Sequence, residues 1–452
     1  MFGHYLTIGW RNIRRSPLYA LINVSSLAIG VAACVLIFLF IQDEFTYDSF
    51  HANTDRIYRL LRHPKPDMEH FDLNRGVTPY MPTPLGPAVE TEIAAFAHAV
   101  RVRDLPAGYA DIPVGSTHFS DGIVFADSAF LRLFTFPLAA GDSATALTDP
   151  SAAVISRDIA TKYFGDMNPI GQTFTMSAFG DEPRDFHITG VLADTPRNSS
   201  IRPDIIIPLK PSSPSPSRTS WYSFNIFTYV LLQPAADPAE VQAAITNLFE
   251  QRRIDEAAAE PGSIADNPFF LTLQPLRAIH LDPETGESLR TYSYILGAIA
   301  LAILLLAAIN FATLAVARAM TRAREIGVRQ VFGAVARQLI VQQLIEVSLL
   351  CGLATAVGLT LAELALPIFT TPTEKSLSLH LWSNWPLVFC ILGLAALLTL
   401  VAGMIPAGIL TRLHPATIFR REAKLRRNGP VVRTLVVVQY ALSITLLICL
   451  MG

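Results

Sequence analysis

The sequence predicts a membrane α-helical protein with about five transmembrane helices and a large α+β extracytoplasmic domain inserted between the first and second of them. The composition indicates a membrane protein, because 51% of the residues are hydrophobic and only 16% are charged, whereas soluble chains carry about 25% charged residues. Five apolar stretches approach the roughly 20 residues that a spanning helix needs. Basic residues gather on one side of the membrane if all of these stretches span it.

The five apolar segments divide the chain into membrane and non-membrane parts. The third segment is the least uniform, since Gln342, Gln343 and Glu346 lie near its start and Glu363 lies near its end. Glu363 either contacts another helix or lies at the outer interface; we favour the interface, with the chain turning back at Pro367. The predicted spans are residues 18–42, 291–317, 339–369, 385–410 and 431–452.

The positive charges set the expected orientation. Arginines precede the first span, and basic residues follow the second and fourth spans in segments 318–338 and 411–430. The loop between the third and fourth spans offers only Lys375 against Glu374. Because cytoplasmic loops are enriched in Lys and Arg, we expect both basic segments and the N-terminus in the cytoplasm. The region 43–290 is then extracytoplasmic.

The first 17 residues form a separate element ahead of the first span. Leu6, Trp10 and Ile13 recur at helical spacing opposite three arginines, which predicts an amphipathic helix on the cytoplasmic surface; a frayed leader peptide is the alternative. Residues 31–34, ending at Cys34, loosely resemble a lipoprotein signal. Apolar residues follow Cys34 where a lipoprotein has a polar tether, so we favour a spanning helix.

Several classes of function find no support in the sequence. The net charge of −2 gives no indication of nucleic acid, and all four cysteines lie in apolar segments without zinc-ligand spacing. His51, His118 and His187 are isolated, and no hydrolase or metalloprotease motif occurs. Residues 165–173 resemble a P-loop, but Gln172 replaces its lysine. We therefore expect no cofactor, no metal, no catalytic residue and no enzymatic activity.

The region 43–290 alternates between strand and helix patterns, as an α+β domain does. Ser156 is expected to cap a helix that Gly165 ends. Residues 211–217 are rich in Pro and Ser and predict a loop. Strands are predicted at 56–62, 152–155, 186–192, 205–209 and 229–232, and helices at 88–100, 157–164 and 238–251.

Short motifs in this region occur in a specific order. They begin with Phe130-Leu131-Arg132-Leu133-Phe134 and continue through Val154-Ile155-Ser156, Asn168-Pro169-Ile170-Gly171, Ile188-Thr189-Gly190-Val191-Leu192 and Pro196-Arg197-Asn198-Ser199. In this order they resemble the extracytoplasmic core domain of MacB-like permeases. Each motif also has a plain structural reading, because the Gly and Asn-Pro positions suit turns and the apolar positions suit a core.

The segment after the second span carries the most specific pattern. It resembles the signature R-x-R-E-I-G-[VI]-R-[KRQ]-x-x-G-A of FtsX-like ABC transporter permeases, in which this loop docks on the ATPase. The positive-inside rule explains the arginines but not their order with Glu, Ile and two glycines. The resemblance implies that the coupling residues are Arg322, Arg324, Glu325, Ile326, Gly327, Arg329, Gly333 and Ala334.

The resemblance implies a permease of the MacB/FtsX-like family in the bacterial cytoplasmic (inner) membrane. Such a subunit transmits ATPase-driven motion to its extracytoplasmic domain and exports or extracts a peptide, lipoprotein or hydrophobic drug. The expected partners are an ABC ATPase subunit at the cytoplasmic face and the lipid bilayer. A second permease half or a homodimer, and an extracytoplasmic partner, are further candidates.

Two other functions stay open at this point. An FtsX-like regulator transports nothing and instead acts on an extracytoplasmic partner such as a cell-wall hydrolase; nucleotide-dependent co-purification of that partner distinguishes it. A membrane-anchored sensor has no ATPase at all. The basic approach and apolar stretch at 426–452 resemble residues 11–42. We therefore expect the fifth span to begin a second repeat, so that the sequence is the N-terminal half of a duplicated permease.

Overall fold

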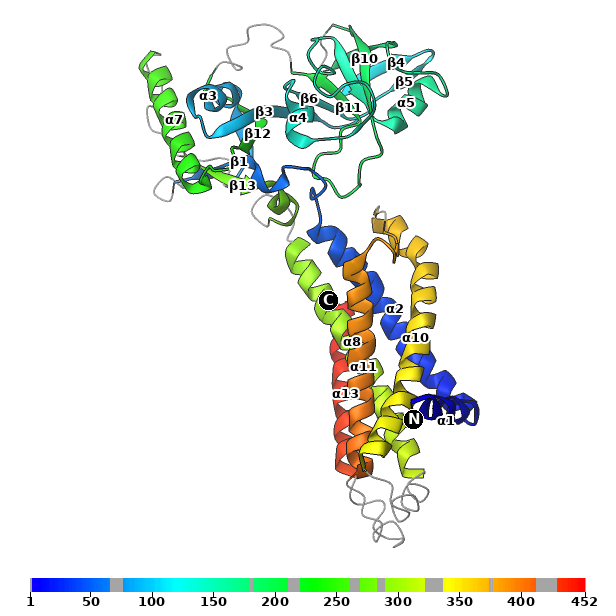
Figure 1. The fold of residues 1–452 in the computed structure, drawn as a ribbon. Coiled ribbons are helices and arrows are strands. Elements are labelled where there is room, and N and C mark those ends of the chain that lie inside the picture. Colours follow the sequence, from blue (N-terminus) through cyan, green and yellow to red (C-terminus); the bar gives the residue numbers. More distant parts are fainter. Residues whose placement is uncertain are drawn as a thin grey trace. The chain divides into compact units, whose positions relative to one another are not determined.

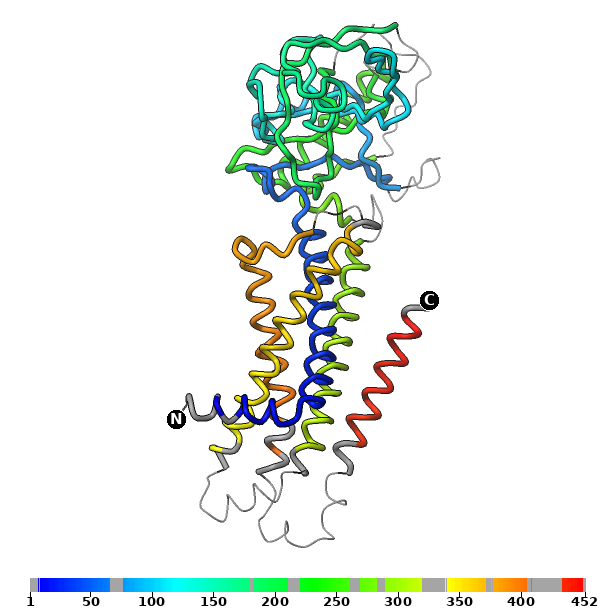
Figure 2. Tube along the Cα trace, turned by 90° about the vertical axis from the view of Figure 1, so that its right-hand side faces the viewer, coloured from blue at the N-terminus to red at the C-terminus, as the bar shows by residue number. Residues whose placement is uncertain are grey.

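The computed structural model describes residues 2–65, 76–178, 182–209, 220–259, 269–282, 289–321, 336–373, 375, 377–411 and 429–451. The chain forms two compact units. The first contains Met1–Asp43 and Thr291–Gly452, and the second contains Glu44–Arg290. Figures 1 and 2 show a helical bundle for the first unit and a sheet-rich body for the second.

The first unit consists mainly of helices over its described segments. Four of its helices are long and apolar enough to cross a membrane, at Pro17–Phe45, Leu289–Arg318, Ile340–Thr370 and Trp385–Met404. The fifth apolar segment also forms a helix, which contains the shorter apolar stretch Arg433–Cys449. The helices are α1 (Phe2–Arg14), α2 (Pro17–Phe45), α8 (Leu289–Thr321), α10 (Ala336–Thr373), α11 (Trp385–Thr411) and α13 (Gly429–Met451).

Small residues let the long helices approach one another closely. A Cβ added to Gly358 of α10 would lie 2.9 Å from Val31 of α2, and one added to Gly403 of α11 would lie 2.8 Å from Leu344 of α10. In lipid, such close packing substitutes for the hydrophobic effect, which gives little drive for one apolar helix to leave lipid for another. The four spanning helices run alongside one another as a result (Figures 1 and 2).

The expected turn at Pro367 is wrong. Helix α10 continues through Pro367 to Thr373. A proline removes one backbone donor and crowds the preceding turn, but membrane helices tolerate it where neighbouring helices hold them. The ring of Phe369 packs edge-on against Phe40 of α2, with centroids 6.1 Å apart. Glu363 is exposed on α10.

The second unit is an α+β domain built on one hydrogen-bonded network of thirteen strands. Their order is β13-β1-β12-β3-β6-β11-β8-β10-β9-β4-β5, with β2 on β12 and β7 on β10. Two pairs are parallel, β10 with β8 and β11 with β6. The strands are β1 (Ile57–Pro64), β2 (Tyr80–Pro82), β3 (Phe96–Leu105), β4 (Ala110–Val114), β5 (Thr117–Phe119), β6 (Ile123–Ala126), β7 (Leu138–Ala140), β8 (Ala152–Ile155), β9 (Thr173–Ala178), β10 (Arg184–Leu192), β11 (Ile205–Pro208), β12 (Phe224–Leu232) and β13 (Phe269–Pro275).

Helices cover this sheet and close its three hydrophobic clusters. Phe130 and Phe134, from one of the sequence motifs, form the fully buried centre of one cluster. Ile159 of α5 lies in a second cluster and Phe249 of α7 in a third. The helices are η1 (Thr54–Arg56), α3 (Leu85–Glu92), α4 (Phe130–Phe134), α5 (Arg157–Phe164), α7 (Pro238–Ala259) and η3 (Leu276–Leu281).

The predicted helix at 88–100 is wrong over its second half. Helix α3 ends at Glu92, and strand β3 begins at Phe96. Residues 96–102 pair with β12 in an antiparallel register from Leu232 to Phe227. Phe96 and Val100, four residues apart, fit both periods, and strand pairing on both sides of β3 decides in favour of the strand.

The capping prediction at Ser156 is confirmed. Its hydroxyl accepts a hydrogen bond from the backbone N–H of Ile159 at 3.2 Å, and Gly165 ends the helix with a positive φ of 59°. The P-loop-like segment that follows is a turn between α5 and β9. There Asn168 accepts from the backbone of Ile170 at 3.1 Å, and Gly171 has φ 82°. The Pro- and Ser-rich stretch 211–217 lies outside the described residues.

Candidate functional site

The predicted coupling residues all lie between the end of α8 at Thr321 and the start of α10 at Ala336. Arg322, Arg324, Glu325, Ile326, Gly327, Arg329, Gly333 and Ala334 are outside the described residues, so their coupling role stays a prediction. The structure does describe the two helices that carry this segment. The helix ends and their contacts define the candidate site.

A polar cluster joins three helices close to these ends. Arg318 of α8 donates from Nη2 to the backbone carbonyl of Asn12 in α1 at 2.9 Å. Asn12 donates from Nδ2 to Oε2 of Glu346 in α10 at 3.1 Å. Arg318 Nη1 lies 3.7 Å from Glu346 Oε1, which completes the triangle with an ion pair. The last helical turns of α8 and the first turns of α10 are thus both tied to α1.

The surroundings of this cluster remove its charges from solvent. The Arg318 guanidinium lies over the ring of Tyr19 in α2, 4.3 Å from the centroid. The side chains of Arg318 and Glu346 are only 14% and 7% exposed. A buried carboxylate or guanidinium without its partner is costly. The pair therefore specifies how α8, α10, α1 and α2 meet at the base of segment 322–335.

Helix α1 packs directly against α10 beside this cluster. A Cβ added to Gly9 would lie 3.0 Å from Leu349 and 3.7 Å from the Cα of Glu346, so a larger residue here would push α1 away. On its other side Trp10 is exposed, and the Arg14 guanidinium lies 5.5 Å from its ring centroid. The helix predicted at the N-terminus is therefore part of the site as well as an amphipathic surface element.

The sequence prediction missed the roles of Asn12, Arg318 and Glu346. From the sequence, Arg318 belongs to the basic segment 318–338, and Glu346 is a polar interruption of the third span. A carboxylate inside an apolar segment needs a polar or charged partner, and that rule was the available signal. It does not identify the partner, because Asn12 lies 334 residues away in the chain.

The other end of the bundle is also fastened by polar contacts. Gln42 of α2 and Asn384 exchange two amide hydrogen bonds of 3.0 and 2.8 Å. Lys375 forms an ion pair with Asp43 and lies over the ring of Phe40, 4.8 Å from its centroid. These contacts hold the connection between α10 and α11 to the end of α2.

Within the second unit, the last turn of α2 and the residues that follow it are fixed by their own network. Glu44 pairs with His280 of η3 at 2.6 Å, and Tyr47 stacks on the His280 ring at 3.3 Å. Asp48 accepts from the Ser199 hydroxyl at 2.9 Å and from the Ser200 backbone N–H at 2.8 Å. Burial raises the pKa of the Asp48 carboxyl, and these hydrogen bonds act against that rise. The network joins the segments adjoining α2 and α8 to the body of the domain.

The described residues offer no arrangement typical of a metal centre. No group of three or more His, Cys, Asp or Glu lies close enough there to hold a metal ion. His118 pairs with Asp111 at 2.8 Å, and His187 lies 3.9 Å from Asp149. His51 is buried among aromatic rings. The three histidines thus have separate structural environments in this part of the chain.

The bundle and the inserted mixed-sheet domain define a multi-pass membrane permease with one large domain between its first two spans. The sequence profile of the MacB-like periplasmic core domain matches residues 20–248, and that of the FtsX-like permease C-terminal domain matches residues 297–415. The chain belongs to the MacB/FtsX-like family of ABC transporter permeases.

Similar proteins agree with this family. The chain is 25% identical over 283 residues to the macrolide export ATP-binding/permease protein MacB of Bdellovibrio bacteriovorus, covering 60% of this chain and 39% of that protein. It is 26% identical over 358 residues to the pyoverdine export ATP-binding/permease protein PvdT of Pseudomonas fluorescens. That match covers 77% of this chain and 50% of that protein. The chain thus spans half or less of the length of these relatives.

Two solved structures resemble the chain over about half of its length. One is a domain of a putative permease from Porphyromonas gingivalis, with 24% identity, a TM-score of 0.41, and coverage of 50% of this chain and 91% of that one. The other is the periplasmic region of MacB from Actinobacillus actinomycetemcomitans, with 11% identity and a TM-score of 0.32. That match covers 48% of this chain and 88% of the other one.

Proposed function

We propose that this chain transmits ATPase-driven motion from segment 322–334 across the membrane to the domain at 44–290. A separate ABC ATPase subunit binds the cytoplasmic face and moves this segment. The transported or extracted substrate is a peptide, a lipoprotein or a hydrophobic drug, as in the family. The relatives MacB and PvdT are named as ATP-binding/permease proteins, which supports an ATPase partner for this permease.

The observation that carries the proposal is the continuity of helix α8. It is a single α-helix from Leu289 to Thr321, which at 1.5 Å per residue is roughly 50 Å long. It begins at the end of the inserted domain's sequence and ends next to residue 322. A continuous helix transmits displacement along its axis without a hinge, so in this proposal α8 carries motion of the segment to the helix end that adjoins the domain in sequence.

The buried cluster at Arg318 supports the same direction of transmission. Because Arg318 and Glu346 both contact Asn12, the ends of α8 and α10 move with α1. A push on the segment between them is then shared by both helices. Without such a tie, motion of the segment would be shared less fully between α8 and α10.

The proposal is tested by replacing two coupling residues. In Ile326→Asp, a charge replaces the expected apolar anchor, and in Gly327→Asp a side chain fills the expected close approach. We expect each change to reduce capture of the Walker-motif ATPase with the affinity-tagged chain, purified from native membranes, by at least about tenfold, as loss of a central anchor does. Quantitative mass spectrometry of the captured proteins gives the readout.

Conservative variants at the same positions are the matched controls. Ile326→Leu and Gly327→Ala should retain capture, and the inserted domain should keep its wild-type unfolding temperature in all four variants. If Ile326→Asp and Gly327→Asp both capture the ATPase as well as the wild type does, segment 322–334 is not the docking element and the proposal fails.

A further inference from the structure

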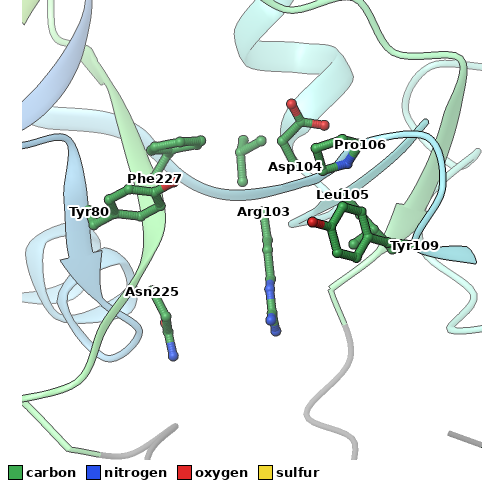
Figure 3. Close-up of a pocket in the computed structure, with 9 residues that line it drawn as sticks. Tyr80, Arg103, Asp104, Leu105, Pro106, Tyr109, Asn225 and Phe227 are labelled. Carbon is green, nitrogen blue, oxygen red and sulfur yellow. The ribbon is translucent and has the colours of Figure 1, made fainter. Parts of the chain in front are cut away.

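A pocket of about 440 Å³ lies on the second unit, and all of its lining residues belong to that unit. Its lining comes from β2, β3, β12 and the connection that follows β3. This volume lies within the range of small-molecule sites. Figure 3 shows Tyr80 and Phe227 on one side of Arg103, and Tyr109 with Pro106 on the other side.

The register of the sheet explains why the pocket lies at this position. Strand β3 pairs with β12 only as far as Val102, which lies opposite Phe227. On its other edge, β3 continues to pair with β6 from Val102 to Leu105. Residues 103–105 therefore extend beyond the β12 ladder, and the pocket occupies the space that this change of partner leaves.

Aromatic rings form the walls and are unusually open to solvent. Tyr80 is 47% exposed and Tyr109 is 62% exposed. Tyr80 stacks on Phe227 with ring centroids 4.9 Å apart and an angle of 26°, so the two rings present one continuous apolar face. Aromatic side chains are favoured at binding sites because they bury a large area at a low cost in conformational entropy.

The polar groups of the pocket are few and directional. The side chains of Arg103 and Asn225 extend to the same side in Figure 3, while the Asp104 carboxylate points to the opposite side of β3. The Arg103 guanidinium lies beside the aromatic walls together with the Asn225 amide, whose Oδ1 accepts from Thr83 at 3.1 Å and whose Nδ2 donates to Ser223 at 3.4 Å. A guanidinium recognises carboxylates through paired N–H donors.

We propose that this pocket binds a small planar aromatic molecule that carries a carboxylate group. The ring system lies against Tyr80, Phe227 or Tyr109, and the carboxylate accepts hydrogen bonds from Arg103 and Asn225. The proposal does not depend on the ATPase coupling described above. It assigns a ligand site to the inserted domain whether the ligand is cargo or a signal.

The test uses 2-naphthoate as the probe and the full chain in lipid nanodiscs, followed by isothermal titration calorimetry against empty nanodiscs. We expect saturable binding with one probe molecule per chain. Arg103→Gln should weaken binding by about tenfold or more, because a charge-assisted pair is replaced by a neutral amide. Tyr109→Ala should weaken it severalfold, and the neutral analogue 2-naphthamide should bind the wild type more weakly than 2-naphthoate does.

Arg157→Gln is the matched control, since the Arg157 side chain is exposed and pairs with Asp194 outside the pocket. It should bind the probe as the wild type does. Tyr109 is exposed, so its variant tests the aromatic wall without disturbing the core. The proposal is overturned if the wild type binds no more probe than empty nanodiscs do, or if Arg103→Gln and Tyr109→Ala both bind as tightly as Arg157→Gln.

Discussion

At the scale of single residues, His51 is a buried titratable group of the inserted domain. It is 2% exposed and lies among the rings of Phe50, Phe134 and Phe136, with centroid distances of 4.0, 5.6 and 5.0 Å. Burial lowers the pKa of the His51 imidazole to about 4, because this environment disfavours its charged form. His51 therefore acts in the folded domain as a neutral, flat core residue.

This lowered pKa predicts an acid-sensitive domain. In the unfolded chain the imidazole takes up a proton near pH 6.5, whereas in the folded domain it resists protonation down to about pH 4. The contribution of neutral His51 to the free energy of unfolding is therefore fully present above pH 6.5. It is lost as the pH falls towards 4, by about 3 kcal/mol at most. Unfolding measured in urea between pH 7 and 4 checks this.

A difference between variants isolates the contribution of His51. Burial raises the pKa of the Asp48, Asp104 and Asp204 carboxyls, and these groups favour the folded state as the pH falls. In His51→Phe, the free energy of unfolding should fall less between pH 7 and 4 than it does in the wild type, because the histidine no longer contributes to that pH dependence. Equal pH dependence of stability in the wild type and in His51→Phe would refute the prediction.

At the scale of elements, the contact of α1, α8 and α10 includes an ion pair between Arg318 and Glu346. Arg318 and Glu346 are both nearly buried, so either charge left alone would lose its compensation. Buried pairs commonly contribute more to specifying one arrangement than to net stability. The helices should therefore tolerate loss of both charges better than loss of one.

A double-mutant cycle tests this dependence. Arg318→Met and Glu346→Met should each lower the free energy of unfolding by about 3 kcal/mol. The double variant should be less affected than the sum of the two, because neither charge is then left unpaired. Thermal unfolding in detergent, with protease accessibility of α1, gives the measurement. Additive losses in the double variant would show that the two side chains act independently.

At the scale of the whole molecule, the two units have different physical origins. The helical unit keeps its backbone groups paired within helices, as lipid requires, and four of its helices are long enough to span. The second unit buries three hydrophobic clusters of its own and has the mixed sheet of a domain folded in water. From the positive-inside rule we propose that the N-terminus and segments 318–338 and 411–430 lie in the cytoplasm.

This orientation is testable with cysteines introduced into a variant lacking the four native ones. Ser143→Cys lies at an exposed position of the inserted domain, and Thr7→Cys lies at an exposed position of α1. An impermeant maleimide should label the first in intact spheroplasts and the second only after permeabilisation. Labelling of Thr7→Cys in intact spheroplasts would reverse the proposed orientation.

Much of the architecture was readable from local pattern. Long apolar runs predict the membrane helices because a helix in lipid must pair all its backbone groups internally. Ser156 and Gly165 identified both ends of α5 because caps act within one helical turn. The boundary between α3 and β3 was misjudged, because Phe96 and Val100 suit both a helix and a strand and the partner strand decides between them.

The sequence by itself determined the fold class, the inserted domain and the family, since these follow from composition, charge placement and motif order along one chain. Tertiary structure alone decided which distant residues meet. It joined Asn12 and Arg318 to Glu346, carried α10 through Pro367, and opened the pocket at Arg103 where β3 leaves β12. The physical reason is that burial and pairing depend on neighbours in space, and the spacing of residues along a chain does not specify them.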